Sequence, residues 1–138
     1  MHFEYNIISG DFSNAGSASS QIKKVLKQLN VETVTIKRIV VALYEAEVNV
    51  VAHSFGGTIF VDINTEEILL RLKDTGPGIP DIKLAMQEGF STASPQVREM
   101  GFGAGMGLAN IKKNADKLEI KSEVGVGTEV TIMVKLNE

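Results

Sequence analysis

The spacing of hydrophobic residues predicts two helices in the first half of the chain. In the first helix, expected from about Ala15 to Gln28, apolar residues recur at three- and four-residue intervals between Ile22 and Leu29. Turn-forming and helix-capping residues precede it at Gly10–Asn14. The second helix, roughly Val34 to His53, carries apolar residues on nearly every side, which is typical of a largely buried helix.

Shorter segments in which hydrophobic and polar residues alternate predict strands. The expected strands are His2–Ile8, Thr58–Asn64, Ile68–Lys73, Leu118–Ser122 and Thr128–Leu136. A short helix is expected at Asp81–Gln87, and a longer one from about Met106 to Lys117. These elements do not follow a regular β–α–β repeat. We therefore predict an α+β fold, in which a mostly antiparallel sheet carries its helices on one face.

The composition fits a single soluble domain that spans residues 1–138. Hydrophobic residues make up 43% and charged residues 22% of the chain, as in ordinary globular proteins. No apolar run is long enough to cross a bilayer and no secretory signal is visible, so we expect a cytoplasmic protein without membrane contact. The absence of cysteine excludes disulfides and thiolate metal sites. A net charge of −3 gives no reason to expect nucleic-acid binding.

Two polar residues in the buried helix are candidates for chemistry. Glu45 and Asn49 are four residues apart and project from the same side, whereas Glu47 points roughly the opposite way. An ionised Glu among apolar residues is costly unless a partner stabilises it. Carboxylate and amide oxygens can bind magnesium or accept a proton, so the pair is a candidate catalytic and metal site. The competing interpretation is that both residues cap a neighbouring strand or reach solvent at a helix edge.

A second candidate motif, Asp74-Thr75-Gly76-Pro77-Gly78-Ile79, directly follows a predicted strand. Glycines lack a Cβ, so a ligand ring could approach the backbone closely at Gly76 and Gly78. Asp74 offers an acceptor for an exocyclic amino group such as that of adenine. A plain Pro-Gly turn would explain the same residues without any ligand.

A third motif is rich in glycine and opens a predicted helix. In Gly101-Phe102-Gly103-Ala104-Gly105-Met106-Gly107-Leu108 the glycines occupy every second position, and free N–H groups at a helix N-terminus favour phosphate. The spacing is that of neither a Rossmann nor a Walker motif, and a flexible glycine linker is the alternative. The polar loop Glu88–Gly105 has a length typical of functional or disordered segments.

The order of these motifs, followed by Gly127-Thr128 before the last strand, is more specific than any one of them. It resembles the ATP-binding domain of the GHKL superfamily, which is shared by DNA gyrase B, heat-shock chaperones, sensor histidine kinases and mismatch-repair ATPases. The resemblance covers about Tyr5 to Leu136. It implies a Bergerat-type two-layer α/β sandwich with a mixed, mostly antiparallel sheet. ATP and Mg²⁺ would be held beneath a lid at about residues 82–105.

The resemblance also implies a role for each motif. Asn49 would hold magnesium, and Thr128 would support the adenine-binding Asp74 through a water molecule. The implied nucleotide-binding residues are Asn49, Asp74, Gly76, Gly78, Ile79, Gly101, Gly103, Gly105, Met106, Gly107, Leu108 and Thr128.

Within the superfamily, the chain is most similar to small bacterial anti-sigma-factor serine kinases and their switch-kinase relatives. The residues that carry this likeness are Tyr44–His53, Gly76–Asp81 and Glu88–Thr92. In those kinases the carboxylate that matches Glu45 accepts the proton of a substrate serine, which makes Glu45 the expected catalytic residue. The implied activity is phosphorylation of a small protein antagonist, and a sigma factor is a further expected partner. Homodimers are common among such kinases, so a homodimer is a possible state.

Other interpretations stay open at this point. Sensor histidine kinases usually carry a lysine where this chain has Ala52, and only His2 precedes the domain, which disfavours a sensor-kinase fragment. A nucleotide-gated protein-binding module with little or no kinase activity is the alternative function. Arg98, Lys112 and Lys113 could add positive charge near the phosphates or be solvated surface cations.

Overall fold

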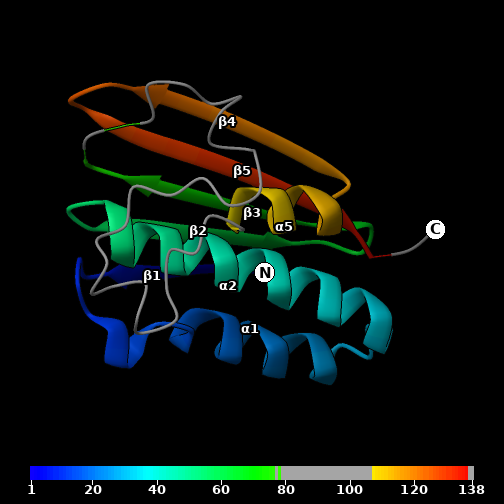
Figure 1. Ribbon diagram of the computed structural model, residues 1–138. Coiled ribbons are helices and arrows are strands. Elements are labelled where there is room, and N and C mark those ends of the chain that lie inside the picture. Colours follow the sequence, from blue (N-terminus) through cyan, green and yellow to red (C-terminus); the bar gives the residue numbers. More distant parts are fainter. Residues whose placement is uncertain (77, 79–106, 137–138) are drawn as a thin grey trace.

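The protein is built from two layers, a sheet and a layer of helices that covers one face of it (Figure 1). The computed structural model describes residues 1–76, 78 and 107–136. The elements in this part of the chain are β1 (His2–Ile7), the short 3₁₀ helix η1 (Phe12–Asn14), α1 (Ser17–Gln28), α2 (Thr33–His53), β2 (Gly57–Ile63), β3 (Glu67–Asp74), α5 (Gly107–Asn114), β4 (Lys117–Glu123) and β5 (Gly127–Lys135). The predicted α+β fold is confirmed. Within the described residues, no helix is both long and apolar enough to span a membrane.

The five strands lie in the order β1-β2-β3-β5-β4, and each described pairing is antiparallel. The register brings Leu70 of β3 between Val61 of β2 and Ile132 of β5, and all three side chains are fully buried beneath the helices. This row follows from the alternation of apolar and polar residues in each strand, because alternate side chains point to the same face. The same register places Asp74 opposite Gly57 at the end of the sheet.

Helix α2 occupies the centre of the helix layer. It packs against α1 on one side and α5 on the other, and it also contacts the sheet. The predicted burial on nearly all sides is confirmed, since its core residues include Ile39, Ala42 and Leu43, each fully buried. Val34, near the N-terminal end, is an exception and is largely exposed.

Two helix boundaries differ from the sequence-based expectation. The helix expected to reach Lys117 ends at Asn114, because Asp116 is already bonded to β5 through its amide and its carboxylate. The helix expected from Ala15 begins at Ser17, because the preceding residues form η1 and Gly16 takes a left-handed conformation. The short helix expected at Asp81–Gln87 lies outside the described residues.

A side chain from α2 caps the N-terminus of α1. Gly16, the N-cap residue of α1, has no side chain that could accept the free N–H groups of the first turn. Instead, the Glu47 carboxylate accepts the amides of Ala18 at 3.2 Å and Ser19 at 3.3 Å. Glu47 is only 3% exposed, so these bonds and the positive end of the helix dipole stabilise a buried charge. The sequence predicted the direction of Glu47 but not this contact.

We expect Glu47→Ala to lower the free energy of unfolding by about 1 to 3 kcal/mol, because it removes the cap and leaves two buried amides without an acceptor. Urea unfolding at neutral pH measures the change. The matched control is Glu66→Ala, which removes an exposed carboxylate and should change stability by less than about 0.5 kcal/mol. Equal effects of the two substitutions would contradict the capping role.

Candidate functional site

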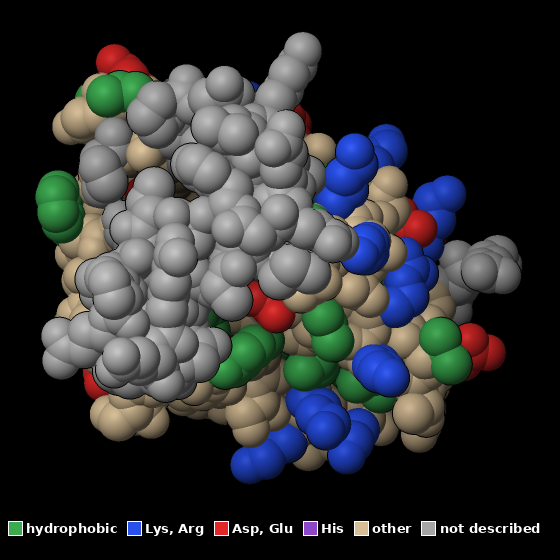
Figure 2. Space-filling view, in the orientation of Figure 1, with side chains coloured by type: hydrophobic (Ala, Val, Ile, Leu, Met, Phe, Trp, Pro, Cys, Tyr) green, Lys and Arg blue, Asp and Glu red, His purple; other side chains and the backbone are tan. Residues whose placement is uncertain are grey.

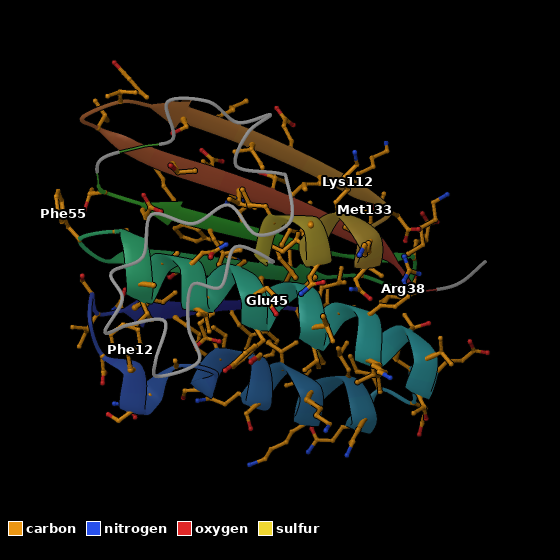
Figure 3. The ribbon with its side chains drawn as sticks, viewed as in Figure 1. Phe12, Arg38, Glu45, Phe55, Lys112 and Met133 are labelled. Carbon is orange, nitrogen blue, oxygen red and sulfur yellow. The ribbon has the colours of Figure 1, made fainter. Side chains whose placement is uncertain are left out.

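Glu45 lies at the middle of α2, on the side that faces α5 (Figure 3). Its Oε1 accepts a hydrogen bond from the side-chain amide of Asn110 in α5, at 3.4 Å. Asn49 follows one turn later, and both Glu45 and Asn49 are half-buried. The structure therefore places this pair beside the helix that the glycine-rich motif opens, and on a different side of α2 from Glu47.

Helix α5 is fixed to α2 at a second point. The Arg38 guanidinium donates to the Asn114 carbonyl at 3.1 Å and to the Asp116 carboxylate at 3.2 Å. Hydrogen bonds from the Lys135 amide and from Arg38 hold the pKa of Asp116 below its ordinary value. Ile111, between the two contact points, is fully buried. The orientation of α5, and with it the position of the Asn110 side chain next to Glu45, is thus set by contacts at the middle and at the C-terminal end of the helix.

Asp74 ends β3 and is bonded to the start of β5. Its Oδ1 accepts the backbone amide of Thr128 at 2.9 Å, and the carboxyl is half-buried. Burial raises the pKa of Asp74, and the Thr128 amide opposes this shift by stabilising the charged form. A carboxylate has two oxygens and several lone pairs, so Asp74 retains the capacity to accept a further bond from an amino group.

The segment that follows Asp74 fits closely between the end of α2 and the turn that joins β4 to β5. The Thr75 amide donates to the Gly56 carbonyl, and the Gly76 amide donates to the Val126 carbonyl, both at 3.1 Å. Gly78 has φ near +76°, and a Cβ there would lie 2.5 Å from the Glu123 carbonyl oxygen. Glycine is therefore required at Gly78 by both conformation and space.

Thr128 is buried, and its hydroxyl is hydrogen-bonded to the Ser122 hydroxyl at 2.9 Å. Gly127, just before it, has φ of +156° and lies against the Asp74 carbonyl, where a Cβ has no room. The resemblance implied a water-mediated link from Thr128 to Asp74. The structure shows a direct contact as well, made by the backbone amide of Thr128, and the water-mediated link stays a prediction.

Several predicted site residues lie outside the described part of the chain. These are Ile79, Gly101, Gly103, Gly105, Met106 and Arg98, together with the expected lid at about 82–105. Gly107 begins α5, and Leu108 is partly buried against the core. Lys112 and Lys113 are exposed in the last turn of α5. They lie at the opposite end of this helix from Gly107, and Figure 3 labels Lys112 there.

The structure adds residues that the sequence did not single out. Asn110 contacts Glu45, and Arg38 fixes α5, although each pair is more than 60 residues apart in the chain. The only local signal was a polar residue, Asn110, in the second turn of a helix that the glycines open.

A divalent cation would need oxygen ligands from this region. The described residues contain no group of three or more His, Cys, Asp and Glu side chains able to hold a metal ion. Magnesium in nucleotide sites is commonly bound by phosphate oxygens and water with one or two protein ligands. The half-buried amide oxygen of Asn49 fits such a single ligand.

Comparison with known proteins identifies the class. The family of histidine kinase-, DNA gyrase B- and HSP90-like ATPases matches residues 34–138, and the chain belongs to this family. Membership implies ATP binding at the level of the family.

Two relatives are similar along most of their length. The serine/threonine-protein kinase RsbT of Bacillus subtilis is 33% identical over 112 residues, 78% of this chain and 78% of the relative. An anti-sigma F factor of Thermoanaerobacter is 32% identical over 132 residues, 92% of this chain and 88% of the relative.

Solved structures share the fold. The RsbU and RsbW domains of Rv1364c from Mycobacterium tuberculosis match with a TM-score of 0.65 and 16% identity over 100% of this chain and 33% of that chain. The mycobacterial sensor histidine kinase MprB matches with a TM-score of 0.56 and 18% identity, over 98% of this chain and 97% of that chain.

We expect Asp74→Asn to raise the midpoint of thermal unfolding at pH 7. The pKa of Asp74 is raised in the folded protein, so its ionisation costs stability at neutral pH, and the amide removes this cost while it can still accept the Thr128 amide. The gap between the variant and the wild type should close as the pH falls below the ordinary Asp value of 3.8, where the carboxyl is protonated in both states. A wild type more stable than the variant at pH 7 would contradict the burial argument.

Proposed function

We propose that the protein is a regulatory serine-protein kinase of the anti-sigma-factor type, which uses ATP and magnesium to phosphorylate a small protein antagonist. The observation that carries the proposal is Glu45, a half-buried carboxylate one turn before Asn49, held beside the helix that the glycine-rich motif opens. Membership of the ATPase family and the names of the two relatives support the same class of activity.

In this proposal the Asp74 region holds the adenine. Asp74 accepts the exocyclic amino group, and its position is fixed by Thr128. Gly76 and Gly78 keep the segment after Asp74 packed closely against Ser54 and Glu123, and Ile79 is the next residue in the sequence. The backbone N–H groups of the glycine-rich motif, Gly101 to Leu108 in the sequence, would bind the phosphates, because a glycine-rich helix N-terminus favours anions.

Glu45 accepts the proton of the attacking serine hydroxyl in this mechanism. The bond from the Asn110 side-chain amide orients the Glu45 carboxylate in this mechanism. Asn49 supplies an oxygen to magnesium, which when bound neutralises charge on the phosphates. Phosphoryl transfer depends mainly on such positioning and electrostatics, so the protein needs little covalent chemistry of its own.

We expect Glu45→Ala and Glu45→Gln to abolish phosphate transfer from labelled ATP and to leave nucleotide binding within about twofold of the wild type, since removing a base lowers rates by about 10²- to 10⁴-fold. Transfer is followed with a captured partner protein, and binding with a fluorescent ATP analogue. Retained transfer in both variants would remove Glu45 from the catalytic role.

Asn110 provides a finer test of the geometry. Asn110→Ala should lower kcat and leave the KM for ATP nearly unchanged, because Asn110 contacts Glu45 and not the nucleotide pocket formed by Asp74.

The matched control is Asn114→Ala on the same helix, whose side-chain amide donates to the Asn110 carbonyl at 2.8 Å. An equal loss of kcat in the Asn114 variant would indicate a general effect on α5 and contradict the positioning role of Asn110.

The alternative function is a nucleotide-gated module that captures a partner with little or no phosphate transfer. The observation that favours it is that relatives such as the one from Thermoanaerobacter are named anti-sigma factors, a name that describes binding. Intact-mass measurement after incubation with ATP separates the two functions. A gain of one phosphate on the partner supports the kinase, and nucleotide-dependent co-elution without modification supports the module.

A further inference from the structure

The exposed side of the helix layer is strongly basic, although the chain as a whole is acidic. Half of the 14 Lys and Arg residues lie on α1, α2 and α5, whereas Glu45 and Glu47 are the only members of the 17 Asp and Glu residues on these described helices. Glu47 is buried, so the surface charge is more one-sided still. We name the outer surface of these helices the basic helix face; its cations are Lys23, Lys24, Lys27, Lys37, Arg38, Lys112 and Lys113.

These cations gather at one end of the helix layer. The lysines of α1 lie in its C-terminal half, Lys37 and Arg38 lie in the second turn of α2, and α5 contributes its last turn. Arg38 bonds to the Asn114 carbonyl, which brings the end of α5 next to the beginning of α2. Figure 2 shows the Lys and Arg side chains grouped over this end of the helices, and Figure 3 shows Phe55 at the opposite end.

Helix stability does not account for this concentration of charge. Lysines in the last turn, such as Lys27 and Lys112, interact favourably with a helix C-terminus. Lys23 lies in the middle of α1, and Lys37 lies near the N-terminal end of α2, where a cation gains nothing from the dipole. Like charges on neighbouring helices also repel one another. A surface of this kind is typical of a site that attracts and orients a partner of opposite charge.

We propose that the basic helix face docks an acidic surface of the protein whose serine is phosphorylated. This inference rests on the proposed function, because the assigned proton acceptor lies on the same layer. Glu45 is seven residues after Arg38 on α2, about 10 Å along the helix, so a partner seated on the face reaches Glu45 without leaving it. A protein ligand is favoured over lipid or nucleic acid, since a serine hydroxyl is what Glu45 requires.

The test compares two double charge reversals that change the net charge equally. Lys23→Glu with Lys37→Glu alters the basic helix face, and Lys73→Glu with Lys135→Glu alters exposed lysines on β3 and β5 of the sheet. Neither pair includes a residue assigned to the nucleotide site. The probe is a short fluorescent peptide with a central serine flanked by Asp and Glu, and its neutral counterpart carries Asn and Gln at those positions. Binding is measured by anisotropy at two salt concentrations, and thermal unfolding confirms that each variant is folded.

We expect the helix-face variant to bind the acidic peptide at least about tenfold more weakly than the wild type, and the sheet variant to bind it as the wild type does. Wild-type binding should weaken as salt is raised, and Lys23→Gln with Lys37→Gln should give an intermediate loss. Equal binding by all proteins would overturn the proposal. So would preference of the face for phosphatidylglycerol vesicles or duplex DNA over the acidic peptide.

The peptide measurement requires no phosphate transfer, which separates this proposal from the proposed function. The wild type could transfer no phosphate and still bind the acidic peptide more tightly than the helix-face variant does. That result would contradict the kinase activity and leave the docking surface supported. Transfer to a partner protein that is unaffected by the helix-face reversals would contradict the docking surface and leave the kinase supported.

Discussion

The hydrogen bond from the Thr128 amide to the Asp74 carboxylate holds together the region on which the proposed nucleotide site depends. It joins the end of β3 to the start of β5, and it fixes one oxygen of a half-buried carboxylate. Gly127 permits this contact because the Asp74 carbonyl occupies the space that a Cβ would take. An Asp whose ionisation is disfavoured by burial is a cost to folding, and such costs are common where a residue serves a ligand.

Helix α2 carries two carboxylates that have different roles, one in stability and one in the proposed chemistry. Glu47 faces α1, and its carboxylate accepts hydrogen bonds from the backbone amides of that helix, so it contributes to stability. Glu45, two residues earlier, faces α5 and touches only the amide of Asn110 among the described contacts, so it keeps the capacity to accept a proton. Two residues of separation on a helix turn a side chain by more than half a revolution, which is why the roles are distinct.

The features that could be predicted from the sequence are those that depend on the local pattern of hydrophobic and polar residues. The alternation in β3 and β5, the all-round burial of α2 and the antiparallel sheet are confirmed, because each depends on the spacing of apolar residues. The resemblance to the GHKL superfamily implied that Thr128 supports Asp74, and the two residues are in contact. The cap by Glu47 and the bonds of Asn110 and Arg38 were not predictable, since they join residues 28 to 78 positions apart. The early end of α5 has the same cause, a contact of Asp116 with a distant strand.

The claim that Asp74 recognises the exocyclic amino group of adenine is tested most directly by titrating the protein with ATP and with inosine triphosphate, which carries an oxygen in place of that amino group. Calorimetry in the presence of magnesium gives both affinities. ATP is expected to bind at least about tenfold more tightly, because inosine triphosphate would set an acceptor against a half-buried carboxylate. Equal affinities for the two nucleotides would contradict it.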